Sequence, residues 1–391
     1  MEVSHHQYQD SKMENENIES QELAVGTFAC SSCGADLKYK PGTQHLNCAY
    51  CGAENDIPQI DVDIEELDFH QYLAQKTESE ESITAKFIKC DNCGASATLE
   101  EDVTATNCAY CASPLVLEHA KEEEVIQPKS LLPFKLNKND AKDQFKQWVN
   151  RLWFAPNDLK KATFNFDHFK GVYIPYWTYD TDTYSKYIGQ RGDYYYVTET
   201  YTTTENGKSV TKTRQVRKTR WSHASGQVHR FFDDILTVAT RSLPQKYIYK
   251  LEPWDLENLV PFDPSYISGF IAEKYQVNLE EGFEIAKDIA EPEIRRLIRR
   301  DIGGDEQRII SLNTSYKDIT FKHLLLPVFV CAYLFKGKLY QFLVNGRTGE
   351  VQGQRPYSWI KITFTVIAVL LLIAAIVFAY QYYQNPPPSD Y

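Results

Sequence analysis

The chain has 391 residues, a formal net charge of -11, and 26 Tyr and 20 Phe among its side chains. This length is enough for two or three compact domains with a sizeable core, so the chain is not a single small module. The aromatic content favours β-rich packing and argues against wholesale disorder.

The charge is unevenly distributed along the chain. Residues 1–22 carry 1 basic and 6 acidic side chains, and residues 23–120 carry 5 and 16. Subtraction from the totals of 42 and 53 leaves 36 and 31 for residues 121–391, so the three net charges are -5, -11 and +5. Because residues 1–22 also offer almost no apolar surface to bury, we expect a disordered acidic tail there.

Eight of the nine cysteines form four CxxC pairs. The N-terminal residues contain no apolar segment of the kind that a signal peptide needs. Closely spaced cysteine pairs in a chain without an export signal favour metal binding over disulfide formation. We therefore expect the cysteines to lie in a reducing compartment.

The four pairs belong to an internal repeat with a period of 60 residues (90 − 30), and each copy places 14 residues between its inner cysteines. Four thiolates on two turns satisfy the tetrahedral preference of zinc and leave no open position for water or substrate. Gly34 and Gly94 give the first turn of each copy its backbone freedom. We predict two structural zinc ions, with the ligand sets Cys30, Cys33, Cys48, Cys51 and Cys90, Cys93, Cys108, Cys111.

The charge of these two zinc ribbons bears on their partner. Zinc ribbons often bind nucleic acid, but phosphate binding needs clustered Lys and Arg. Residues 23–120 hold five basic side chains against sixteen acidic ones, and each zinc ion with four thiolates adds a further -2. We therefore expect no direct nucleic-acid binding and favour a protein partner, with a purely architectural role as the alternative.

The cysteine spacing and the hydrophobic patterns along the chain predict a multidomain protein. It has two tandem zinc ribbons of small β type, a central α+β domain with a long β-hairpin, and one transmembrane helix. The predicted segments are a tail at 1–22, ribbons at 23–58 and 87–120, an acidic linker at 59–86, the α+β domain at 125–355, the span at 359–380 and an external tail at 381–391. Within the linker, Ile60, Ile64, Leu67, Tyr72 and Leu73 follow a loosely helical spacing, so we expect a short amphipathic helix.

In the α+β domain, Asn139 or Asp140 is expected to cap a helix that buries Phe145, Trp148, Val149 and Leu152. Helical spacing returns at 265–275 and 279–300, and Gly303-Gly304 is the expected stop of the second helix. The expected strands are 173–187, 324–335, 339–344 and 350–352, with a long hairpin at 193–221.

A two-residue turn at Asn206-Gly207 would pair residues whose numbers sum to 413. Lys212, Arg214, Lys218 and Arg220 would then face Tyr201, Glu199, Tyr195 and Asp193. This pairing accounts for the basic stripe through ion pairs and cation–aromatic contacts, without an anionic ligand. The same turn ends like a phosphate-binding loop, but position 202 is Thr where that motif has Gly.

No recognised catalytic motif occurs in the chain, so we expect no enzyme. His223, His229, Asp233 and Asp234 form the densest polar cluster, for which a hydrolytic or metal site is the alternative to a surface role. Cys331 lies in an apolar segment, and we expect it to be buried in the core.

Residues 362–380 are apolar or aromatic apart from two threonines and contain no charge. Nineteen residues make a helix of roughly 28 Å, close to the hydrocarbon thickness of a bilayer. Arg347, Arg355 and Lys361 precede this segment, whereas residues 381–391 contain no Lys or Arg. We therefore expect a single-pass cell-membrane protein with cytoplasmic N-terminal domains, an external C-terminal tail and insertion after translation.

The hairpin YYYVTETYTTTENGKSVTKTRQVRKTRW and the segments DIGGDEQRI, TFKHLLLP and VNGRTGEVQG carry a family resemblance. With two ribbons and a terminal span, the chain resembles bacterial membrane proteins labelled TFIIB-type zinc ribbon-containing, or primosomal protein N′/superfamily II helicase-like. The resemblance implies a membrane-anchored partner of SPFH-domain and phage-shock-protein-A-type proteins in membrane stress, and only the eight cysteines carry over as site residues. It favours a non-enzymatic adaptor. The alternative is a nucleic-acid-binding or helicase-associated factor.

Overall fold

The computed structural model describes residues 28–58, 64–74, 82–98, 107–115, 120–161, 169–205, 207–336 and 338–384. The expected tail at 1–22 and most of the expected external tail lie outside the described residues.

A sheet of nine strands forms the centre of the molecule, and its main path runs in the order β11-β10-β14-β15-β16 with antiparallel pairing. These strands are β10 (Lys170–Glu205), β11 (Lys208–Val238), β14 (Glu306–Phe335), β15 (Lys338–Asn345) and β16 (Val351–Gly353). Four short strands join it: β5 (Leu67–Asp68), β9 (Ser130–Leu131), β12 (Val260–Pro261) and β13 (Ile271–Ala272). The expected strands are therefore present, but β10 and β14 are much longer than their apolar segments indicated.

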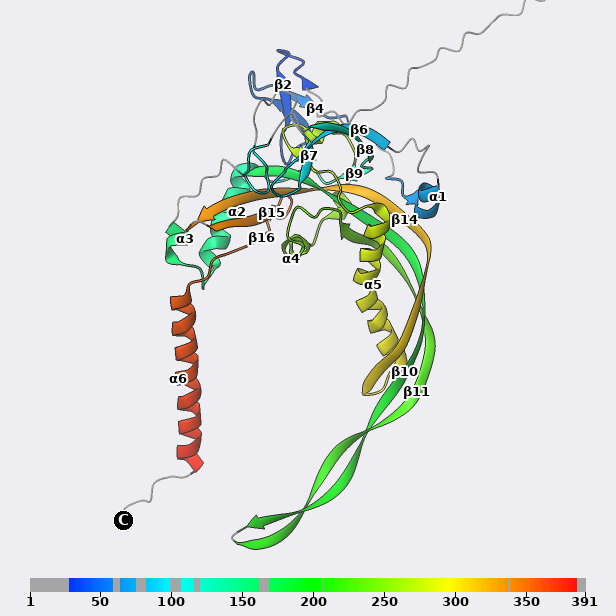
Figure 1. The fold of residues 1–391 in the computed structure, drawn as a ribbon, viewed down its shortest axis with the longest axis vertical. Coiled ribbons are helices and arrows are strands. Elements are labelled where there is room, and N and C mark those ends of the chain that lie inside the picture. The colour runs from blue at the N-terminus through cyan, green and yellow to red at the C-terminus, as the bar shows by residue number, and fades with distance from the viewer. Residues whose placement is uncertain are drawn as a thin grey trace, which may run out of the picture.

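The helix α5 (Leu279–Ile302) packs against the concave side of the curved part of this sheet (Figure 1). Asn278 caps it by accepting a hydrogen bond from the backbone of Glu281 at 2.8 Å, and Gly303, with a φ of 65°, ends it. The prediction of a helix at 279–300 with a glycine stop is confirmed. Its buried face comprises Leu279, Gly282, Phe283, Ala286, Ala290, Ile294, Ile298 and Ile302.

The predicted helix near Phe145 is α2 (Lys138–Arg151), and α3 (Asn157–Lys161) follows it. Its cap is Asn137 instead of Asn139 or Asp140, because the Asn137 side chain accepts from the backbone N–H groups of both later residues while Asp140 bonds back to the Asn137 backbone. This reciprocal capping box needs its acceptor one residue before the first helical turn.

The helix predicted at 265–275 is wrong. The structure has a single turn of 3₁₀ helix at Pro264–Ile267, followed by β13. Gly269 adopts a φ of 82°, which interrupts the helix, and Ile271–Ala272 pairs with β10. Sheet pairing therefore overrides the local helical spacing. The remaining short elements here are α4 (Gln245–Ile248) and 3₁₀ turns at Tyr249–Leu251 and Leu256–Asn258.

The predicted register of the long hairpin is confirmed, because Glu199 pairs with Arg214 and Glu205 with Lys208. Arg214 lies 3.4 Å from Glu199, as expected. Other partners differ, since Asp193 pairs with Arg191 of its own strand and Arg220 lies over Tyr195. Long side chains reach diagonal neighbours as readily as opposed ones on a twisted ribbon.

The segment assigned as linker packs against the central sheet. A short helix is present, α1 (Phe69–Ala74), in which Phe69 and Tyr72 are buried, but it contains only the last two of the expected positions, Tyr72 and Leu73. Leu67 lies instead in β5, which pairs with β14, Ile64 is not helical, and Ile60 lies outside the described residues. The sheet of the second ribbon consists of β6 (Ser82–Lys89), β7 (Ser96–Thr98) and β8 (Lys121–Ile126). This ribbon therefore extends past both expected limits, 87 and 120, because β6 and β8 pair with each other outside the cysteines.

The first ribbon is a separate sheet of β1 (Phe28–Ala29), β2 (Asp36–Tyr39), β3 (His45–Cys48) and β4 (Glu54–Asp56). It lies at the end of the molecule opposite α6 (Trp359–Gln384), as Figure 1 shows. Residues 359–381 are long and apolar enough to cross a bilayer, and none of their most apolar stretch is buried in the protein. The chain therefore has one candidate membrane span among the described residues.

Candidate metal centres

The structure brings the eight predicted cysteines together as two groups of four. Within each group, the sulfur atoms all lie within 4.8 Å of one another. The closest pairs are separated by 3.7 and 3.6 Å in the first ribbon and by 3.6 and 3.5 Å in the second. A tetrahedral ion with metal–sulfur bonds of about 2.3 Å requires sulfur–sulfur separations of about 3.8 Å. Both groups therefore fit a closed four-sulfur metal site.

The same backbone turn presents all four CxxC pairs. In each turn, the first cysteine accepts a hydrogen bond at its carbonyl from the residue four positions on and donates its N–H to the residue five positions on, at 2.8–3.0 Å. The fifth residue of each turn has a positive φ: Gly34, Gly52, Gly94 and Ala112. The sequence identified this requirement at Gly34 and Gly94, and it applies equally to the second turn of each ribbon.

Backbone N–H groups inside these turns favour the thiolate form that a metal requires. In the first ribbon, the backbone of Ser32 donates to Cys30 and lowers the pKa of this thiol to about 6. The backbone of Cys51 likewise lowers the pKa of Cys48. The pKa of Cys33 in the same ribbon is instead raised to about 12, because hydrogen bonds with neighbouring thiols, Cys51 first, favour its protonated form. The fold therefore favours the thiolate at some of the ligands only.

The second ribbon inserts the tip of its second turn into the central domain. Tyr110, between Cys108 and Cys111, is 1% exposed, and its hydroxyl donates to a carboxylate oxygen of Glu273 at 2.8 Å. Gln341 on β15 donates its side-chain amide to the Tyr110 carbonyl at 2.5 Å. This ribbon is therefore part of the core of the central domain.

The first ribbon contacts the central domain through its sheet and leaves the tip of its second turn outside. Tyr39 on β2 is buried, and its hydroxyl donates to the carbonyl of Phe134 at 3.2 Å. Ser268 donates its hydroxyl to the carbonyl of Leu37 at 2.7 Å. Tyr50, the counterpart of Tyr110, is 86% exposed. Both copies therefore contact the body through a strand, but only the second also buries the tip of its second turn there.

A distant relative matches most of the chain. The chain is 26% identical to the "Uncharacterized protein YdjG" of Bacillus subtilis (strain 168). The match spans 333 residues, which is 85% of this chain and 90% of the relative. No family model matches the chain, and no solved structure matches it. The similarity therefore covers most of the chain but assigns no activity.

The predicted polar cluster does not form one site. His223 and Asp234 lie eleven residues apart on β11, roughly 36 Å at the rise of an extended strand. His229 pairs with Asp182 at 2.5 Å and stacks on Tyr184. Strand geometry therefore separates residues that are close in sequence. Cys331, by contrast, is 1% exposed and is a core residue as expected.

A second charged cluster was not anticipated. Glu66, directly before β5, lies 2.9 Å from Lys322 on β14, and Lys322 lies 2.9 Å from Asp234. Asp180 accepts a hydrogen bond from the backbone of Asp234 at 2.7 Å. Burial, together with a hydrogen bond to Glu66, raises the pKa of Asp180 to about 7. Four segments of the chain contribute to this cluster, so no local pattern could have found it.

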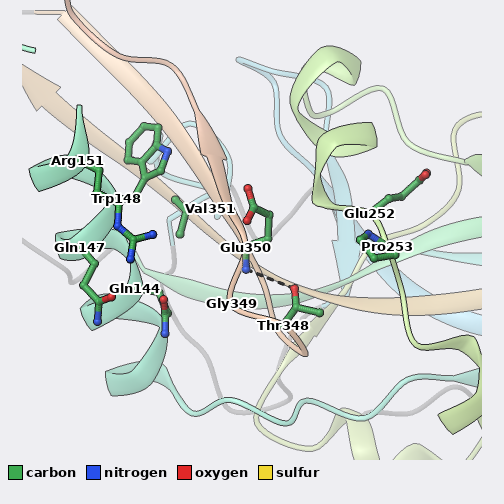
Figure 2. Close-up of a pocket in the computed structure, with 10 residues that line it drawn as sticks. All are labelled: Gln144, Gln147, Trp148, Arg151, Glu252, Pro253, Thr348, Gly349, Glu350 and Val351. Atoms are coloured by element: carbon green, nitrogen blue, oxygen red, sulfur yellow. Dashed lines mark hydrogen bonds between the residues drawn. The ribbon is translucent and has the colours of Figure 1, made fainter. Parts of the chain in front are cut away.

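An open pocket of about 360 Å³ lies between α2 and residues 252–253 (Figure 2). Gln144, Gln147, Trp148 and Arg151 line it from the helix, the turn 348–351 forms its middle, and Glu252 and Pro253 lie opposite. Its ionisable groups are one guanidinium and two carboxylates, and these lining residues include no nucleophile paired with a base. We assign no reaction to this pocket.

Proposed function

We propose that the protein is a non-enzymatic, membrane-anchored adaptor that presents its first zinc ribbon to a protein partner. One observation carries this proposal: the second copy of the ribbon buries the tip of its second turn, Tyr110, in the body, whereas the equivalent tip of the first copy, Tyr50, stays exposed.

The metal in both sites is proposed to be zinc. The donor set is four sulfur atoms at tetrahedral spacing, which selects soft, tetrahedral ions such as zinc. With four protein ligands, no position is left for a reacting water, so the ions would act structurally.

The helix α6 is proposed to span the cell membrane. Its 23-residue apolar segment would cover about 35 Å at helical rise, with Trp359 at one end and Tyr380 near the other. Arg347, Arg355 and Lys361 precede the span, which favours a cytoplasmic location for the ribbons. The residues that follow the span would then lie on the external side.

The partner is proposed to be a protein involved in membrane stress, of the SPFH-domain or phage-shock-protein-A type that the family resemblance implies. Direct nucleic-acid binding is not part of the proposal, because residues 23–120 carry a net charge of 5 − 16 = -11 before the zinc sites are counted.

The test compares variants of the full chain, purified in detergent, in which two metal-ligating cysteines of one ribbon or of the other are replaced by serine. Wild-type protein is expected to contain two zinc ions, and Cys33→Ser/Cys51→Ser and Cys93→Ser/Cys111→Ser one each. Loss of the first site should release the co-purifying partner and should change the melting temperature less than loss of the second, although Cys30 and Cys48 belong to a core cluster. Loss of the second should lower that temperature, because its turn is part of the core. An unchanged set of partners in the first variant would contradict the adaptor proposal.

A further inference from the structure

Both ribbons carry the pentapeptide Asn-Cys-Ala-Tyr-Cys in their second metal-binding turn, at residues 47–51 and 107–111. The surroundings of the two copies differ. Tyr110 and Ala109 are buried in the body, whereas Ala49, Tyr50 and Cys51 are exposed. The chain therefore contains both a bound and a free example of one surface.

The bound example shows which chemistry this surface recognises. Tyr110 is buried in an apolar core cluster that also contains Leu243 and Leu343, and its hydroxyl donates to Glu273 at 2.8 Å. Thr240 also donates to Glu273, at 2.7 Å, which holds the carboxylate in place at the end of the pocket. The carbonyl of Tyr110 receives its hydrogen bond at the rim, from Gln341. The pocket thus combines apolar walls, a terminal acceptor and a donor at its edge.

The first ribbon cannot bury Tyr50 in the same way without leaving its own position. Its sheet is held by Leu37 and Tyr39, both buried in one cluster with Phe134 and Tyr266 of the central domain. This ribbon lies at the end of the molecule away from α6 (Figure 1). Within the described part of the chain, the tip is free for a second molecule.

We propose that the tip of the first ribbon, Cys48–Gly52 with Tyr50 at its centre, docks into a protein that offers an apolar, tyrosine-sized pocket closed by a hydrogen-bond acceptor. This inference rests on the proposed adaptor function and names the docking residue and the chemistry of the partner. The partner is a different protein, because in a second copy of this chain the equivalent pocket is already filled by Tyr110.

The test begins with a benzoylphenylalanine cross-linker placed at position 50 of the full chain in its native membrane, and at position 196 as a matched exposed site. Tyr196 is a good control because it is 64% exposed and pairs with Arg217 in the long hairpin of β10 and β11. The far end of that hairpin lies away from the first ribbon (Figure 1). The cross-linked protein is then purified. Its affinity is measured for the wild-type chain and for the variants Tyr50→Ala, Tyr50→Phe and Tyr196→Ala.

If Tyr50 docks into such a pocket, its substitutions should reduce the affinity for the partner by different amounts. Tyr50→Ala should weaken binding about 30-fold or more, since it empties the pocket. Tyr50→Phe keeps the ring but leaves the acceptor unpaired, and should weaken binding about 10-fold. Tyr196→Ala should bind like wild type. Because the Tyr50 side chain is exposed, all variants should retain two zinc ions, and zinc content checks that the ribbon is folded.

Other outcomes distinguish the docking role of Tyr50 from the adaptor function. A partner that binds Tyr50→Ala as tightly as wild type overturns the docking role of Tyr50 and leaves the adaptor function standing. Cross-links from position 50 to a second copy of the chain overturn the assignment of a different protein. Absence of any cross-linked protein at both positions, in membranes where the chain is intact, overturns the adaptor function as well.

Discussion

At the residue scale, the metal-binding turns depend on one backbone conformation. Each turn requires a positive φ at its fifth residue, and three of the four positions are glycine. Ala112 is the exception, with a φ of 60°. A residue with a Cβ in this region costs about 1 kcal/mol relative to glycine, so the second ribbon retains strain that the first does not.

Ala112→Gly should therefore stabilise the protein by about 0.5–1 kcal/mol, despite the greater freedom of glycine in the unfolded chain. The expected result is a higher melting temperature in calorimetry of the detergent-purified chain, with two zinc ions retained. Ala109→Gly, in the same turn, is the control and should destabilise, because Ala109 is 6% exposed and its methyl group packs in the core. A loss of stability in Ala112→Gly would contradict the strain argument.

The Asp180 cluster makes stability depend on pH. The folded pKa of Asp180, about 7, lies above its ordinary value of 3.8, so the folded state holds a proton that the unfolded state releases. This contribution is complete below pH 3.8 and is lost as the pH rises through 7. Between pH 5 and 8 the loss should amount to about 2 kcal/mol.

Asp180→Asn should reduce that loss, because an amide donates to Glu66 at any pH. Unfolding measured at pH 5, 6, 7 and 8 should give a flatter profile for the variant than for wild type. Parallel profiles for the two proteins would show that Asp180 does not hold the proton.

At the element scale, α5 depends on a close approach to β10. A Cβ at Gly282 would lie 2.8 Å from the Trp177 ring and would overlap the Tyr179 hydroxyl. That hydroxyl donates to the Leu279 carbonyl at 2.7 Å, and the Trp177 indole donates to Val277 at 2.9 Å. Both hydrogen bonds link the sheet to the start of the helix, so displacing either ring would loosen this junction.

Gly282→Ala should thus destabilise by about 1–2 kcal/mol, because overpacking outweighs the gain in helix propensity. Asp288→Ala, on the exposed face of α5, should change stability by less than about 0.5 kcal/mol. Chemical unfolding of the two variants gives the comparison. Equal stabilities would mean that the helix can shift without cost.

At the scale of the whole molecule, the long hairpin and α6 extend from the body toward the same side (Figure 1). A two-stranded ribbon with open edges and charged side chains such as Arg214 and Lys218 cannot enter hydrocarbon. If α6 spans the bilayer, it must change direction relative to the body near Ser358. The contacts here include hydrogen bonds from Ser358 to Phe154 and from Lys361 to Ala155, each 2.8 Å long.

Nitroxide labels at Tyr196→Cys and Ile367→Cys in lipid vesicles test this reorientation. The label at 196 should be accessible to a water-soluble nickel complex, and the label at 367 to oxygen dissolved in the bilayer. The unsubstituted chain controls for labelling of the native cysteines. Oxygen accessibility at 196 that matched that at 367 would contradict the reorientation.

The sequence by itself determined the features that depend on neighbours in the chain. The spacing of Cys30 to Cys51 predicts a four-sulfur site, Asn206-Gly207 sets the hairpin register, and Gly303 ends α5. Each follows from local backbone geometry, which a few adjacent residues specify.

Only the tertiary structure decided how these elements are used. The same pentapeptide is exposed at Tyr50 and buried at Tyr110, because Glu273 and Gln341 come from segments more than 150 residues away (273 − 110 = 163; 341 − 110 = 231). The Glu66–Lys322 ion pair likewise joins distant segments, whereas His223 and Asp234, close in sequence, are held apart by an extended strand. The burial of a residue and its contacts depend on the packing of the whole molecule. Identical local sequences therefore acquire different roles when different distant residues pack against them.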